Sequence, residues 1–405
     1  MADAIALHVM LDDQASRARL EEELQQDFHI RLAEEIPHRP VAAGSSVQAP
    51  PLLWRYFLDP QPGISRRPGQ RVGQGLGQGY DQGRGPEHGS GEGRGHGFGS
   101  GDGGPVVGAS AEYDPEFADS LVDFVMHINR DLPGVYVFSC ARNMGVFKGV
   151  GYPEDIGEFF RLDDYAGYMW TGHGRFPTNT HAWWGGAHPF SLLDWTVVHN
   201  GEISSYGTNR RFLEMYGYYC TLQTDTEVIA YAADLLMRRH HLSVNEAALV
   251  LAAPMWKEID RLPATARQRL TVLRRVYAPL LLNGPFTVII ARSGELIGLG
   301  DRVRLRPFVA ASAGDRLYVA SEEAAIRVVE PQLDQVWIPR GGEPVVGRLD
   351  GLAQAGVPGA VAASAAVARA QATTATTTTT AACAAAWPAA RPSGRAGWGE
   401  QEVAG

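Results

Sequence analysis

The sequence contains few cysteines: only Cys140, Cys220 and Cys383 occur among 405 residues. Their spacing fits neither a disulfide framework nor a Cys-rich metal or iron–sulfur site, so we expect a reducing, cytoplasmic compartment and no metal. No apolar run reaches the roughly 18 residues of a membrane-spanning helix, so we expect no membrane partner. No Gly-x-Gly-x-x-Gly motif follows an expected strand, and we expect no bound cofactor.

An excess of positive charge is also missing, because the chain carries a formal net charge of −9. Nucleic-acid-binding domains usually carry a basic face, so we expect no nucleic-acid partner. Arginines do occur in the Gly-rich region between residues 69 and 104, but acidic residues are interspersed with them. This region therefore does not indicate RNA binding.

Glycine and proline are plentiful but unevenly placed, with 47 Gly and 25 Pro in the chain. Residues 69–104 have almost no apolar side chains and cannot bury a core, so we predict a disordered insertion at 61–110. An Ala/Thr-rich stretch predicts a disordered tail at 351–405. Residues 1–60 and 111–350 would then be two parts of one interrupted domain.

The remaining sequence alternates between helical and strand periodicity, which predicts an α+β fold. One helix is expected after Asp114-Pro115, where an N-cap residue precedes a Pro at the first helical position. Two more are expected at 224–238 and 244–251, a further helix after Asp13, and a short one at 212–216. The expected strands are 4–11, 28–32, 135–140, 144–150, 195–198, 286–290, 296–299 and 316–320.

Three short polar motifs follow one another within about 55 residues, each at the edge of an apolar run. The first surrounds Arg175, whose planar guanidinium can grip a carboxylate through two parallel hydrogen bonds. Thr178 could add a hydroxyl to the same anion. A surface arginine in a loop is the alternative, although Gly172 and Gly174 favour a loop with close backbone approach.

The second motif is Asn200-Gly201, which follows the apolar residues 195–198. An Asn amide and a Gly backbone N–H at a strand end can together hold the oxyanion of a tetrahedral intermediate. The alternative is an ordinary hairpin turn, for which Asn-Gly is the strongest short signal.

The third motif is Thr224-Asp225-Thr226-Glu227 at the start of an apolar helical pattern. Thr224 and Glu227 together predict a capping box. The capping box does not require Asp225, whose carboxylate at the helix start could accept a ligand ammonium. The three motifs together suit a pocket for a small zwitterion.

In this order the motifs resemble the glutaminase domain of class II glutamine amidotransferases, most closely that of glutamate synthase. The resemblance runs from about residue 135 to about 327. It implies the four-layer αββα sandwich of N-terminal-nucleophile hydrolases. It also implies that Arg175 and Thr178 bind the glutamine α-carboxylate, that Asn200 and Gly201 form the oxyanion hole, and that Asp225 binds the α-amino group.

Members of this family attack glutamine with an N-terminal Cys, whose own α-amino group acts as the base. This chain begins Met1-Ala2, so we expect the nucleophile to be absent and the sandwich to be N-terminally incomplete. Cys140 and Cys220 follow apolar residues and are interpreted as buried thiols, not as displaced nucleophiles. His173, His181, His188 and His199 lie close in sequence, but their spacing matches no metal motif.

The resemblance implies hydrolysis of glutamine to glutamate and ammonia, with the ammonia passed to an acceptor such as 2-oxoglutarate. The ligands would be glutamine and glutamate, and separate glutamate synthase subunits would carry the redox centres. A second hypothesis keeps the pocket but not the reaction: a glutamine- or glutamate-binding regulatory or scaffold module without the nucleophile.

Overall fold

The computed structural model describes residues 4–61, 113–175, 182–222, 224–349 and 380–381. The expected insertion, the expected tail and Cys383 fall largely or wholly outside these ranges. Among the described residues no helix is long and apolar enough to cross a membrane. Helices and antiparallel sheets occur together, which confirms the α+β class.

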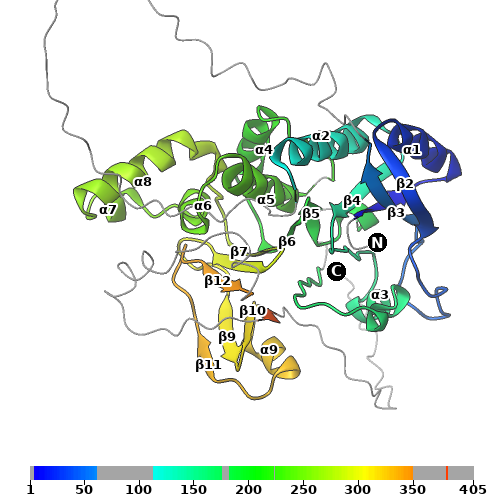
Figure 1. Ribbon diagram of the computed structural model, residues 1–405. Coiled ribbons are helices and arrows are strands. Elements are labelled where there is room, and N and C mark those ends of the chain that lie inside the picture. Colours follow the sequence, from blue (N-terminus) through cyan, green and yellow to red (C-terminus); the bar gives the residue numbers. More distant parts are fainter. Residues whose placement is uncertain (1–3, 62–112, 176–181, 223, 350–379, 382–405) are drawn as a thin grey trace, which may run out of the picture.

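Helices and strands are interspersed along the chain (Figure 1). The helices are α1 (Gln14–Asp27), α2 (Pro115–Asp131), α3 (Pro153–Phe159), α4 (Tyr206–Glu214), α5 (Asp225–Ala233), α6 (Val244–Leu251), α7 (Trp256–Ile259), α8 (Ala264–Val276) and α9 (Glu323–Val329). A π-helical turn, η3 (Asp234–Arg239), continues α5, and 3₁₀ turns lie at η1 (Leu162–Asp164), η2 (Trp184–Gly186) and η4 (Ala278–Leu280).

The strands form three sheets. One sheet has the order β2-β3-β1-β4, another β12-β8-β7-β6-β5, and the third β11-β9-β10-β13. Their bounds are β1 (Ile5–Leu11), β2 (Phe28–Glu35), β3 (Leu52–Pro60), β4 (Val135–Ala141), β5 (Phe190–Leu192), β6 (Trp195–Gly201), β7 (Phe286–Arg292), β8 (Glu295–Gly300), β9 (Val309–Ala313), β10 (Arg316–Ala320), β11 (Gln335–Trp337), β12 (Val345–Arg348) and β13 (Thr380–Ala381).

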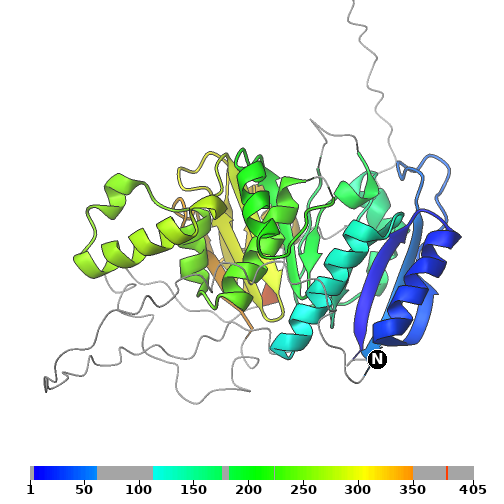
Figure 2. The ribbon, with the colours of Figure 1, turned by 90° about the horizontal axis from the view of Figure 1, so that it is seen from above.

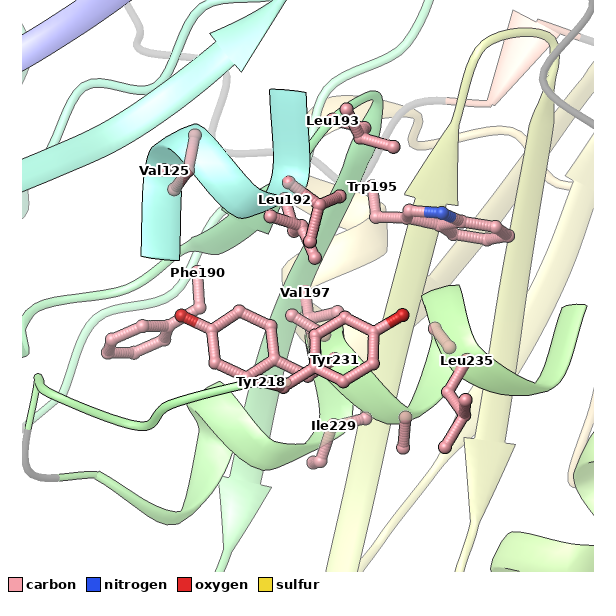
Figure 3. Packing of buried hydrophobic residues seen from close by; sticks show 14 of the residues in the cluster. Val125, Phe190, Leu192, Leu193, Trp195, Val197, Tyr218, Ile229, Tyr231 and Leu235 are labelled. Carbon is pink, nitrogen blue, oxygen red and sulfur yellow. The ribbon is translucent and has the colours of Figure 1, made fainter. Parts of the chain in front are cut away.

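The β5–β8 region is covered on both faces, and every residue of β7 and β8 is buried. Helix α5 packs on one face, where Trp195 and Val197 of the sheet meet Tyr218, Ile229 and other apolar side chains (Figure 3). On the opposite face, β6, β7 and β8 meet β9 and β10 through a second cluster. That cluster comprises Val198, Ile289, Ala291, Leu296, Phe308, Ala310, Leu317, Val319 and Val345.

Helix α9 closes the outer face of the β9–β10 sheet, where Ile326 packs on Ala311 and Tyr318. The order of layers in this half of the molecule is therefore helix, sheet, sheet, helix. The β1–β4 sheet and α1 lie at one end of the molecule, and α7 and α8 lie at the other (Figure 2). Strand β1, which precedes the Gly-rich residues 69–104 in the sequence, pairs with β4, which follows them.

Two of the predicted helices are confirmed together with the N-cap residues predicted for them. Asp13 caps α1 by accepting the Ser16 N–H at 2.7 Å. Asp114 caps α2 from the position before Pro115. These signals act within a few residues of the helix end, and so could be recognised in the sequence.

The strand predicted at 144–150 is wrong, because this segment joins no sheet. The Val150 carbonyl accepts the Gln48 N–H at 2.9 Å, and the Val146 carbonyl lies 3.4 Å from His8 Nδ1. Lys148 is buried and donates to the Gly185 carbonyl at 2.9 Å. Loop and side-chain partners thus replace a strand ladder here.

Candidate functional site

Asn200 and Gly201 are the last two residues of β6, so the alternative of a hairpin turn is wrong. They pair with Thr287 and Phe286 of β7, and the chain bends away only afterwards. Gly201 has a φ of +154°. A Cβ there would lie 2.0 Å from the Pro285 carbonyl oxygen, so no larger residue fits without displacing the strand. A glycine is required at this position.

The Asn200 side chain points away from α5, as the alternation of side chains along a strand requires. Its amide donates to Ser321 Oγ at 3.0 Å, just beyond the end of β10. His199 and Gly201 lie on the other face of β6, on the α5 side. The contact of Asn200 with Ser321 joins residues 121 positions apart and has no signal in the sequence.

Asp225 is the first residue of α5 and is held from two sides. Its Oδ2 accepts the Ile203 N–H at 2.8 Å, and its Oδ1 lies 3.7 Å from His199 Nδ1. Burial raises the pKa of Asp225, but the nearby His199 ring, the Ile203 N–H and the Arg175 guanidinium together outweigh it and lower the pKa. The carboxylate is therefore ionised near neutral pH and suited to an ammonium.

The capping box predicted at α5 is wrong in one of its two parts. Thr224 does cap the helix, by accepting the Thr226 N–H at 3.3 Å. Glu227, however, accepts the N–H groups of Thr221 and Leu222 and the Tyr231 hydroxyl, at 3.0, 2.9 and 2.7 Å. These three donors occupy the carboxylate, which instead fastens the preceding loop to α5.

Arg175 lies within electrostatic range of Asp225, His173 and His188, and its positive charge lowers the pKa of each. An electrostatic interaction thus links Arg175 of the first motif to Asp225 of the third. Thr178 lies outside the described residues. Among the described residues no group of three or more His, Cys, Asp or Glu side chains is placed to hold a metal ion.

Two buried histidines and one half-buried histidine lie near the start of α5. His188 Nε2 lies 2.9 Å and His199 Nδ1 3.2 Å from Thr226 Oγ1. The His173 ring stacks on His188 with their centroids 4.4 Å apart. Burial lowers the pKa of His173 to about 4 and that of His188 well below its usual value, and neighbouring cations add to both effects. The spacing of these histidines matches no metal motif, and the sequence pattern indicated no role for them or for Thr226.

Neither thiol in the described part of the chain resembles an activated nucleophile. Cys140 is buried in β4 and Cys220 is partly buried before α5; both are free. Burial raises the pKa of each thiol well above its usual value. Reactive cysteines have lowered pKa values, so both behave as packing residues.

This chain is similar to a known family, to two proteins and to a solved structure. Residues 124–337 match the family described as "Glutamine amidotransferases class-II". A protein of Archaeoglobus fulgidus described as "Uncharacterized protein" is 48% identical over 350 residues, which cover 86% of this chain and 80% of that one. The glutamine–fructose-6-phosphate aminotransferase (isomerizing) of Vibrio vulnificus is 28% identical over 200 residues, or 48% of this chain and 29% of the enzyme.

A solved structure, the glutamine phosphoribosylpyrophosphate amidotransferase of B. subtilis with ADP and GMP, also matches at 22% identity. The matched region covers 38% of this chain and 29% of the chain in that structure, with a TM-score of 0.22. The chain thus spans most of its Archaeoglobus relative but less than a third of the Vibrio enzyme's length.

Proposed function

This chain belongs to the class II glutamine amidotransferases, and from that premise we propose that it is the glutaminase component of a split glutamate synthase. In this proposal it hydrolyses glutamine to glutamate and ammonia, and the ammonia reaches an acceptor such as 2-oxoglutarate on another chain. Separate subunits would carry the redox centres. Free thiols at Cys140 and Cys220 support a reducing, cytoplasmic setting.

The observation that carries the proposal is the electrostatic interaction of Arg175 with Asp225, whose carboxylate lies beside the end of β6. A guanidinium and an ionised carboxylate close together match the α-carboxylate and α-ammonium of glutamine. We assign Arg175 and Thr178 to the carboxylate and Asp225 to the ammonium. The Gly201 N–H and the second amide proton of Asn200 are the proposed oxyanion donors.

We also propose that residues 1–60 and 111–350 are one domain, interrupted by an insertion at 61–110 and followed by a tail at 351–405. The pairing of β1 with β4 supports the joined domain. The helix–sheet–sheet–helix order around β6 and β10 supports the four-layer sandwich of N-terminal-nucleophile hydrolases.

A binding module without catalysis is the second candidate. The burial of Cys140 and Cys220 favours it, because the described part of the chain then offers no thiol to attack glutamine. We propose accordingly that neither thiol is the nucleophile. Release of ammonia from glutamine by the purified chain, unchanged by Cys140→Ala, decides for the enzyme; binding without release decides for the module.

Both candidate functions require the same glutamine-binding site, so ligand binding tests that site directly. Arg175→Lys keeps the positive charge but loses the planar fork, so L-glutamate should bind about ten-fold more weakly by calorimetry. Asp225→Asn should weaken L-glutamate binding at least as much. Arg327→Lys, on the distant helix α9, is the matched control and should bind as wild type does. Unchanged affinity in both site variants would remove this pocket from the proposal.

A further inference from the structure

Thr226 stands at the centre of a buried polar group formed by His188, His199 and Asp225. Its hydroxyl lies 2.9 Å from His188 Nε2, 3.2 Å from His199 Nδ1 and 3.5 Å from Asp225 Oδ1. Thr226 itself is completely buried, and both histidines are at most 8% exposed. One hydroxyl therefore contacts both rings and the carboxylate proposed to receive the ligand ammonium.

The number of protons in this group determines its hydrogen-bond directions. An ionised carboxylate only accepts, so the single Thr226 proton is directed to Asp225. The two lone pairs of the hydroxyl then accept N–H groups from the two rings. Burial and nearby cations lower the pKa of His188 well below its usual value, so that ring is neutral and carries only one N–H.

The ring atoms on the far side support these directions. His188 Nδ1 and His199 Nε2 are buried and have no hydrogen-bond partner among the described residues. A bare nitrogen lone pair left without a partner is a smaller loss than a buried N–H left without an acceptor. The protons therefore sit on His188 Nε2 and His199 Nδ1, both facing Thr226.

We propose that Thr226 is a positioning residue, which His188 and His199 orient so that its hydroxyl holds the Asp225 carboxylate ready for an amino group. This inference rests on the proposed binding of the α-amino group by Asp225. The Ile203 N–H holds the other carboxylate oxygen at 2.8 Å, so both oxygens of Asp225 have assigned donors. A fixed carboxylate loses less conformational entropy when the ligand binds.

Comparing the affinities of two ligands distinguishes a loss of Asp225 positioning from general damage to the pocket. L-Glutamate carries the α-amino group, whereas glutarate has the same two carboxylates without it. Thr226→Val keeps the shape but removes the hydroxyl, and should weaken L-glutamate binding about ten-fold, the scale of one hydrogen bond to a charged group. Glutarate affinity should stay within about two-fold of wild type, and Thr226→Ser should restore L-glutamate binding.

The outcomes distinguish this inference from the proposed function. L-Glutamate affinity within two-fold of wild type in Thr226→Val, or an equal loss for glutarate, overturns the positioning role. If Asp225→Asn still weakens L-glutamate binding, only the positioning role fails. If Asp225→Asn has no effect, the amino-group site itself is wrong, and the positioning inference fails with it.

A measurement on the unmodified protein keeps the inference testable if Thr226→Val does not fold. With ¹⁵N-labelled histidine, NMR should show His188 protonated on Nε2 and His199 on Nδ1 at neutral pH. The Nδ1–H tautomer is the less common form of a neutral histidine, so its presence at His199 would reflect the acceptor at Thr226. A His199 ring protonated on Nε2 alone would overturn the assignment.

Discussion

At the scale of single residues, Gly201 is the position where the backbone leaves no choice of side chain. It combines a positive φ with a Cβ position 2.0 Å from the Pro285 carbonyl oxygen and 2.9 Å from His199 Nε2. The same absence of a side chain leaves its backbone accessible at the end of β6. The requirement for glycine and the proposed oxyanion role thus coincide at one residue.

Gly201→Ala should lower the free energy of unfolding by about 2–6 kcal/mol, from about 1–3 for backbone strain and about 1–3 for overpacking. Gly207→Ala in α4 is the control, because its Cβ would meet nothing nearer than 3.8 Å. That change should stabilise the helix by about 0.5–1 kcal/mol. Urea unfolding of both variants checks the opposite signs, and a Gly201→Ala protein as stable as wild type would contradict the described strand end.

At the scale of elements, α5 and the π-helical turn η3 are tied to α2 by a buried charged group. Arg238 donates to both oxygens of Asp234 at 2.6 and 2.7 Å and to Asp119 of α2 at 2.8 Å. The Tyr218 hydroxyl donates to Asp234 at 2.6 Å. Because α5 carries Asp225, this group also anchors the helix that presents the ligand carboxylate.

Arg238→Met should destabilise the fold by about 3–5 kcal/mol, because it leaves the fully buried Asp234 without its counter-charge. Arg269→Met is the matched control: this side chain is 71% exposed beside Glu246, and its loss should cost at most about 1 kcal/mol. Both values come from the free energy of unfolding in urea. Equal effects of the two changes would show that burial does not determine the strength of the Asp234–Arg238 pair.

At the scale of the whole molecule, buried titratable groups make stability depend on pH. Burial lowers the pKa of His8 and of His173 to about 4, and that of His188 well below its usual value. Unfolded, each histidine would titrate near 6.5. Between pH 6.5 and 4 the unfolded chain therefore binds about three more protons at these sites than the folded chain. Burial raises the pKa of Glu227 to about 7, which opposes this by about one proton.

With a net difference of about two protons, the free energy of unfolding should fall by about 2–3 kcal/mol for each pH unit below 6.5. Urea unfolding at pH 6.5, 5.5 and 4.5 measures this slope. His8→Gln should reduce it by about 1.4 kcal/mol per pH unit, whereas His29→Gln, at an exposed position, should leave it unchanged. Stability that does not fall between pH 6.5 and 4.5 would contradict the lowered pKa values of these histidines.

The sequence by itself determined what depends on neighbours within a few residues. The caps at Asp13, Asp114 and Thr224 were recognisable because each accepts an N–H from two or three residues further on. The strand before Asn200 and the α+β class followed from apolar periodicity, and the order of the three motifs indicated the family. The roles of Arg175, Asn200 and Asp225 remain predictions, since only ligand binding or turnover tests them.

The tertiary structure alone decided which distant groups meet. Pairing with β7 makes Asn200-Gly201 a strand end where the local signal indicated a turn. Three donors around Glu227 take that carboxylate away from the helix cap. His188 and Thr226 are 38 positions apart, yet they are in contact because β5, β6 and α5 pack together. Such contacts depend on how sheets and helices stack. The local pattern of residues in the sequence carries no information about that stacking.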